Sequence, residues 1–139
     1  MTSQPGSPAP AGDNEVVDLS VPADPAYLSV MRTATAGLGT HLNLTLDEIE
    51  DLQIAVDEAC ALLIGSDEGR DLADRSLNTS FTVHRGVLTV RIDGPAAALP
   101  SDENFAWTML HALSGEVSTG TTAGGTWIVL TCRGRGVAA

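Results

Sequence analysis

Lysine is missing from the 139-residue chain, and all seven of its basic residues are arginines. This absence excludes any mechanism that depends on a lysine amine. The arginines stand against 18 aspartates and glutamates, so the net charge is −11. Because an acidic surface repels a phosphate backbone, direct binding of nucleic acid is not expected. The charge suits a partner protein with a basic surface, or it serves only to keep the chain in solution.

Cysteine and histidine are also scarce, and neither type is clustered. Cys60 and Cys132 lie far apart and form no C-x-x-C motif. In a cytosolic protein we expect both to be reduced thiols in the core, and we expect no metal site. His41, His84 and His111 are scattered along the chain. With no Walker loop and no nucleophile elbow, the sequence offers no standard hydrolase or zinc-enzyme site.

Long apolar runs are absent as well. No segment reaches the roughly 18 consecutive apolar residues of a membrane span. The N-terminus has neither the basic region nor the apolar region of a secretory signal. A hydrophobic fraction of 43% is ordinary for a globular domain. We therefore expect a cytoplasmic protein with no membrane partner.

The length of the chain suits one domain with one core. Residues 1–14 are rich in Pro, Gly and Ser and predict a disordered tail. The single domain is expected to span residues 15–133. Residues 134–139 are expected to form a frayed tail.

The strongest structural signal lies in residues 45–64. Thr45 and Glu48 have the T-x-x-E spacing of a capping box, in which each side chain bonds the other residue's backbone N–H. Apolar residues then recur at steps of three and four, the period of a helix with one buried face. This stripe consists of Ile49, Leu52, Val56, Ala59 and Leu63. With Gly65 suited to a C-terminus, the pattern predicts a helix over 46–64.

Weaker patterns predict the remaining elements. The predicted strands are 16–22, 77–84, 87–93 and 124–131, and the other predicted helices are 25–38 and one that begins near Ser101 or Asp102. In chain order the elements read β-α-α-β-β-α-β. Three helices can then cover one face of a mostly antiparallel sheet, which predicts a two-layer α+β sandwich.

Residues 55–60 read Ala-Val-Asp-Glu-Ala-Cys. This segment resembles the N-box helix of RsbW-type anti-sigma factors, small serine-protein kinases of the Bergerat (GHKL) ATPase class, which reads roughly E-A-x-T-N-A. The resemblance implies the Bergerat fold and places Glu58 at the position of the kinase's general base. In the family an Asn four residues later holds the nucleotide's Mg²⁺, and here Leu62 stands there. A leucine offers no oxygen ligand to Mg²⁺.

The other nucleotide motifs of the family are altered too. Asp93 and Gly94 resemble its D-x-G-x-G box, in which the Asp accepts the adenine amino group, but Gly94 comes one residue early and the second Gly is missing. In the family's lid, two glycines leave backbone N–H groups free for phosphates, and here those positions are Asn104 and Ala106. Thr126 lies in a last strand that matches the family's final G-T strand. The altered motifs predict that Mg-ATP is not bound as a cofactor.

Arg32 lies off the apolar stripe of the helix predicted at 25–38, so it is expected to face solvent. A gapless count back from residues 46–49 places it on the family's first-helix arginine, which contacts both the sigma factor and the anti-anti-sigma factor. Arginine suits such a contact because its planar fork pairs bidentately with carboxylates. By the same resemblance, Leu28 and Thr35 join Arg32 in the predicted partner-binding set.

Three functions remain open from the sequence. The first is an anti-sigma-factor-like regulator that sequesters a sigma factor, is countered by an anti-anti-sigma (STAS) protein, and has lost ATP binding and kinase activity. The second is an active serine-protein kinase that uses Mg-ATP, with Glu58 as base, to phosphorylate that antagonist. The third is a scaffold that binds an unrelated regulator. Family members often form dimers, so a homodimer is also open.

Overall fold

The computed structural model describes residues 15–65, 75–99 and 105–133, with the backbone alone at residues 105 and 106. The tails predicted at 1–14 and 134–139 lie outside the described residues. The same is true of the helix start predicted near Ser101 or Asp102.

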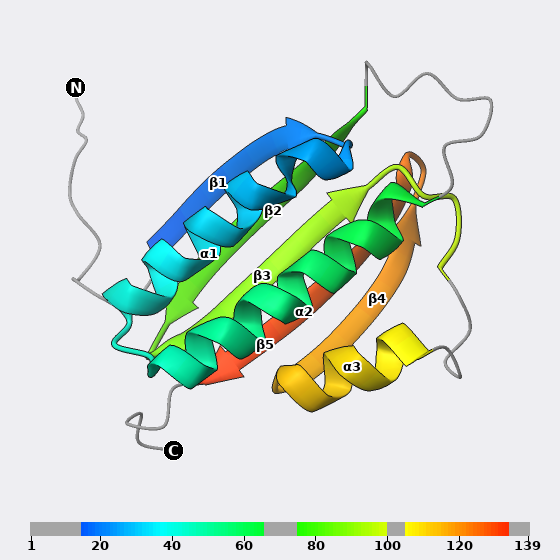
Figure 1. The fold of residues 1–139 in the computed structure, drawn as a ribbon. Coiled ribbons are helices and arrows are strands. Elements are labelled where there is room, and N and C mark those ends of the chain that lie inside the picture. The colour runs from blue at the N-terminus through cyan, green and yellow to red at the C-terminus, as the bar shows by residue number, and fades with distance from the viewer. Residues whose placement is uncertain (1–14, 66–74, 100–104, 134–139) are drawn as a thin grey trace, which may run out of the picture.

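The strands form one five-stranded sheet in the order β1-β2-β3-β5-β4, and every neighbouring pair is antiparallel. Their bounds are β1 Glu15–Pro22, β2 Ser76–His84, β3 Val87–Gly94, β4 Glu116–Thr122 and β5 Gly125–Arg133. The described helices lie on one face of this sheet (Figure 1). They are the 3-10 turn η1 Pro25–Tyr27, α1 Leu28–His41, α2 Leu46–Ile64 and α3 Phe105–Leu113. The predicted two-layer α+β sandwich is therefore confirmed.

Helix α2 is the centre of the helix layer and contacts α1, α3 and the strands β2, β3 and β5. Its bounds match the prediction, and its capping box is formed. The Thr45 N–H donates to the Glu48 carboxylate at 2.7 Å, and the Glu48 N–H donates to the Thr45 hydroxyl at 3.1 Å. None of the helices in the described ranges combines the length and the apolar character that crossing a bilayer requires.

The core lies between α2 and the middle of the sheet. Alternate residues of β2, β3 and β5 point toward the helices and are buried, because successive side chains of a strand point to opposite faces. They include Leu77, Phe81, Val83, Leu88, Val90, Ile92, Ile128 and Leu130. The predicted hairpin is therefore confirmed, both in its pairing and in its buried face.

The sequence predicted one strand after the last helix, whereas the structure has two. Strand β4 pairs with β5 along its length, from Glu116 opposite Thr131 to Thr122 opposite Gly125. Its residues are mostly Ser, Thr and Gly, and only Val117 is apolar, so no alternation marked it as a strand. It forms because β5 supplies partners for its backbone groups.

The first helix is longer than predicted. Residues 25–27 form a 3-10 turn, and α1 then continues to His41. The prediction ended it near Gly37 and Gly39, which resemble a helix terminus. Gly39 instead lies against α2, where an added Cβ would come within 2.8 Å of the Ile49 side chain. The glycine therefore permits the two helices to approach closely and does not end the first one.

Burial controls the chemistry of the two cysteines. Burial, and next the nearby Asp57 carboxylate, raise the pKa of the Cys60 thiol to about 12. Cys132 is half-buried, and its pKa is also raised, chiefly by burial and further by Glu48 and Asp51. Both thiols are free, as the sequence predicts.

We expect Cys60 to resist thiol reagents in the folded protein. At pH 8 a pKa of about 12 leaves only about one thiol in ten thousand ionised. A Cys132→Ser variant should therefore take up no dithionitrobenzoate until denaturant is added. Because the unfolded chain ionises Cys60 near 9.0, the fold should also lose stability as the pH rises from about 9 to about 12. Rapid stoichiometric labelling of the folded variant would contradict the burial of Cys60.

Candidate functional site

Glu58 and Leu62 lie one turn apart on α2, and both are half-buried. The helix turns them about 100° and 140° away from Asp57, whose side chain reaches across to α1. They therefore share a flank of α2 that faces away from α1. Leu62 packs against the hydrophobic core on this flank.

This flank does not fit a nucleotide-bound magnesium ion. Mg²⁺ requires oxygen ligands in near-octahedral geometry, and Leu62 presents methyl groups at the position where the family uses an amide. Within the ranges that the structure describes, no group of three or more His, Cys, Asp or Glu side chains could hold a metal. Among the described residues, Glu58 therefore has no set of companion ligands.

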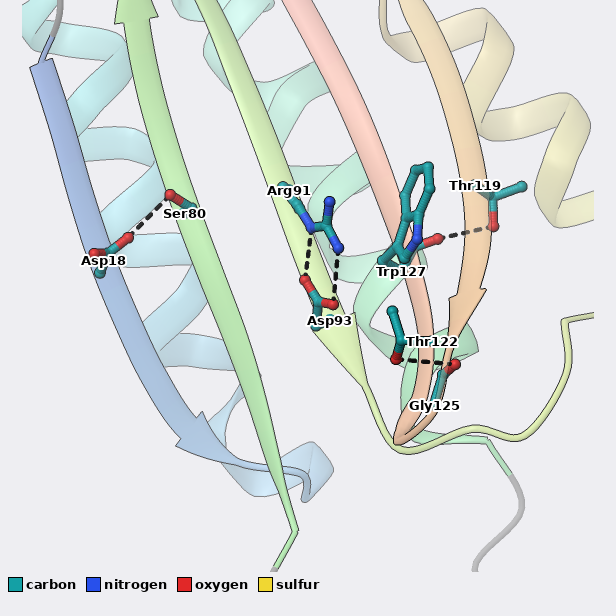
Figure 2. A network of polar contacts seen from close by, with 8 residues as sticks. All are labelled: Asp18, Ser80, Arg91, Asp93, Thr119, Thr122, Gly125 and Trp127. Carbon is teal, nitrogen blue, oxygen red and sulfur yellow. Dashed lines mark hydrogen bonds and ion pairs between the residues drawn. The ribbon is translucent and has the colours of Figure 1, made fainter.

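Asp93 lies on the other face of the sheet. Its neighbour Ile92 is buried toward the helices, so Asp93 points away from them. Figure 2 shows Asp93 on this open face, where both carboxylate oxygens accept hydrogen bonds from Arg91 at 2.9 and 3.2 Å. The guanidinium carbon of Arg91 also lies 4.8 Å from the centroid of the Trp127 ring. The structure therefore does not bring Asp93 and Glu58 together, and the adenine contact that the resemblance implies for Asp93 stays a prediction.

The loop after β3 is hydrogen-bonded to the C-terminal end of α2. The Ala96 N–H donates to the Leu63 carbonyl oxygen at 2.9 Å, and the Ala96 carbonyl oxygen accepts from the Thr126 hydroxyl at 3.1 Å. Gly94 is buried so closely that an added Cβ would come within 2.6 Å of the Leu63 side chain. The Thr126 hydroxyl therefore donates a hydrogen bond inside the protein, and residues 94–96 pack against the C-terminal end of α2.

Asp93 and Gly94 do line a hollow of about 430 Å³, but it lies at the end of the sheet. Its other lining residues are Arg75, Ser76, Asn78, Pro95, Thr122 and Gly124. Neither Glu58 nor Leu62 is among them, so this hollow is separate from the flank of α2 with the predicted base. Asn104 and the side chain of Ala106, the predicted phosphate positions, lie outside the described residues.

Arg32 belongs to α1, and its side chain reaches across to α2. Its Nη1 donates to Asp57 Oδ2 at 2.8 Å, and Gln53 Nε2 donates to the Arg32 carbonyl oxygen at 3.0 Å. The side chains of Arg32 and Asp57 are 45% and 31% exposed. The second oxygen of Asp57, Oδ1, is buried and has no hydrogen-bond partner among the described residues. Leaving such an atom unpaired costs roughly 1–3 kcal/mol. The position of the Asp57 carboxylate is therefore unfavourable when Asp57 is considered without Arg32.

Three curated proteins show what this chain is similar to. It is 30% identical over 105 residues to the anti-sigma-F factor RsbW of Mycobacterium tuberculosis, an alignment that covers 74% of this chain and 60% of that protein. It is 35% identical over 81 residues to the serine-protein kinase RsbW of Bacillus pumilus, which covers 55% and 50%. The same kinase of Bacillus subtilis is 44% identical over 46 residues, which covers 33% and 29%.

A solved structure agrees in fold. The RsbU and RsbW domains of Rv1364c from Mycobacterium tuberculosis match with a TM-score of 0.69 at 16% identity, over 86% of this chain and 32% of that one. The chain belongs to the RsbW family. No protein-family model matches it. The chain spans between 29% and 60% of the length of the curated RsbW proteins named above.

The predicted RsbW partner surface needs one correction. Thr35 is fully buried, and its hydroxyl donates to the Met31 carbonyl oxygen at 2.7 Å. Leu28 is half-buried and packs against the core. Both residues belong to the apolar stripe that faces inward, so the predicted contact of Thr35 with a partner is wrong. Of the three predicted residues, Arg32 is the one whose polar side chain reaches the surface.

The structure also reveals contacts that the resemblance to RsbW did not indicate. Gln53 and Asp57 hold Arg32, and Arg91 stacks on Trp127. Gln53 and Asp57 have helical i, i+4 spacing, which predicts only that they share a flank of α2. Their contact with a residue of α1 depends on how the two helices pack.

Proposed function

We propose that this chain is a cytoplasmic anti-sigma factor that acts by binding a sigma factor and has lost ATP binding and kinase activity. The observation that carries the proposal is the contrast between the two flanks of α2. One flank carries Leu62 in place of a magnesium ligand, whereas the other holds Arg32 in a half-exposed position. The name of the Mycobacterium tuberculosis relative, anti-sigma-F factor, supports the same assignment.

The proposed partners follow from the surface and from the resemblance. A sigma factor would be held at Arg32, and an anti-anti-sigma protein of the STAS type would displace it by competing for the same surface. A sigma factor has basic surfaces for DNA, and the net charge of −11 on this chain suits such a partner. A homodimer is compatible with this role.

An active serine-protein kinase is the second candidate. Glu58 keeps the position of the general base, and the two Bacillus relatives are named serine-protein kinases. In that case the antagonist would be phosphorylated on a Ser. The two candidates differ in whether Mg-ATP binds.

We expect Arg32→Ala to weaken sigma-factor binding by about thirtyfold or more. A buried interface arginine contributes about 2 kcal/mol or more, which corresponds to that factor. The measurement is retention of each purified sigma factor from the same genome on immobilised chain, followed by biolayer interferometry of the one retained. The melting temperature should change little, because a partly exposed ion pair contributes about 1 kcal/mol at most.

Arg91→Ala is the matched control. Arg91 is as exposed as Arg32 and is also paired with an Asp, but it lies on the opposite face of the sheet. It should retain the sigma factor with unchanged affinity. Failure of the unmodified chain to retain any sigma factor would favour the unrelated-regulator scaffold. A fall of many degrees in the melting temperature of Arg32→Ala would make Arg32 a structural residue.

A further inference from the structure

Two residues of α2 hold both the side chain and the backbone of Arg32. Gln53 and Asp57 lie one turn apart and so leave the same flank of the helix. Asp57 accepts from the guanidinium at 2.8 Å, and the Gln53 amide donates to the Arg32 carbonyl oxygen at 3.0 Å. We call Arg32, Gln53 and Asp57 the arginine clamp. It joins α1 to α2 at the residue that the proposed function assigns to the partner.

The clamp leaves most of the guanidinium available. Within the described part of the chain, Arg32 uses one of its five side-chain N–H groups, and its side chain is 45% exposed. An arginine with no neighbour to hold it moves among many rotamers, and a partner has to immobilise it on binding. Because Asp57 already fixes the guanidinium, an incoming carboxylate meets a fork of donors that is held in place.

The hydrogen bond to Arg32 explains the orientation of the Asp57 side chain, because the surroundings of its other oxygen do not favour it. Its Oδ1 is buried without a partner in the described residues, which is unfavourable for a carboxylate. The Arg91–Asp93 pair on the open face provides a contrast, because there both carboxylate oxygens accept from the guanidinium. In the pair at Arg32, one carboxylate oxygen lacks a hydrogen bond, and one guanidinium N–H is used within the described residues.

We propose that Gln53 and Asp57 are positioning residues that pre-organise Arg32 for a carboxylate of the partner. The inference rests on the proposed anti-sigma function, since it requires a partner at Arg32. It adds that part of the affinity depends on two residues of α2 that act through Arg32 and need not touch the partner themselves.

The first test is the affinity of Asp57→Asn, which keeps the shape of the side chain and removes its charge. Against the purified sigma factor that the unmodified chain retains, we expect binding to be about three- to tenfold weaker, the range that immobilising one flexible side chain represents. The melting temperature should not fall, because the buried Oδ1 no longer belongs to a charged group. Gln53→Ala should weaken binding in the same direction, and Asp93→Asn, the matched control, should leave affinity unchanged.

Two double variants separate positioning from stability. In an Arg32→Ala background, Asp57→Asn should have no further effect on affinity, because no guanidinium remains to be held. The charge swap Arg32→Asp with Asp57→Arg restores an ion pair between the helices, so it should keep the melting temperature and still lose the partner. Additive effects in the first variant, or recovered binding in the swap, would overturn the positioning role.

A third measurement needs no partner. The ¹⁵N relaxation of the Arg32 Nε–H group should report a rigid side chain in the unmodified protein and a flexible one in Asp57→Asn. An unchanged order parameter overturns the clamp. Unchanged or tighter affinity in Asp57→Asn, with Arg32→Ala still weakened, also overturns it and leaves the proposed function intact. If the unmodified chain retains no sigma factor, the proposed function itself fails, and with it the role of the clamp.

Discussion

Titration of the purified chain with Mg-ATP is expected to give no heat of binding, and incubation with labelled ATP and an STAS-domain protein should transfer no phosphate. Phosphoryl transfer depends almost wholly on the placement of the phosphates and the metal. Leu62 packs against the core at the position where the resemblance to RsbW places the magnesium ligand. Asp93 is paired with Arg91 on the opposite face of the sheet from Glu58. A general base raises the rate by a factor of roughly 10² to 10⁴, and only when the substrate is already in place.

The serine-protein kinase RsbW of Bacillus subtilis provides the positive control for both measurements. Micromolar binding of Mg-ATP by this chain would favour the kinase alternative over loss of activity. Glu58→Gln would then decide the role of the base. If phosphate transfer occurred and fell by about 10² or more in that variant, Glu58 would be catalytic and the proposed loss of activity would be wrong.

Gly125→Ala is expected to destabilise the fold by roughly 3 kcal/mol or more. Gly125 has a φ of 158° at the start of β5, a conformation that side chains disfavour. An added Cβ there would also collide with the backbone carbonyl oxygen of Gly94. Backbone strain and overpacking each cost roughly 1–3 kcal/mol, and here they act together. Urea unfolding followed by circular dichroism gives the change in the midpoint.

The neighbouring Gly124→Ala is the matched control. An added Cβ at Gly124 meets no atom within 4 Å, and its φ is not in the positive range. Its free energy of unfolding should change by less than about 1 kcal/mol, with a small gain from the stiffer unfolded chain. Equal midpoints for the two variants would show that β3 and β5 do not approach as closely as the structure places them.

The elements with strong local signals were predictable from the sequence. Helix α2 matches its prediction because the capping box and the apolar stripe act within the helix itself. The hairpin of β2 and β3 matches because apolar residues alternate on both sides of the turn. β4 was missed because its Ser, Thr and Gly residues carry no period, and only the neighbouring strand makes it a strand.

The candidate site was predictable only in part. The spacing of Glu58 and Leu62 on one turn required nothing beyond helix geometry. The alternation of Leu88, Val90 and Ile92 in the sequence places Asp93 on the opposite face of the sheet, whereas its pairing with Arg91 came only from the structure. The helical spacing of Leu28, Met31, Thr35 and Leu38 already placed Thr35 on the apolar stripe, although the resemblance assigned it to the partner surface.

The sequence by itself determined the resemblance to RsbW, the two-layer sandwich and the presence of Leu62 four residues after Glu58, because these depend on residue identity and short-range spacing. Only the tertiary structure decided which side chains meet. Arg32 and Asp57 are 25 residues apart and come into contact because α1 and α2 pack side by side on one sheet. Contacts of this kind depend on the register and approach of whole elements, and those are fixed by burial of the shared core.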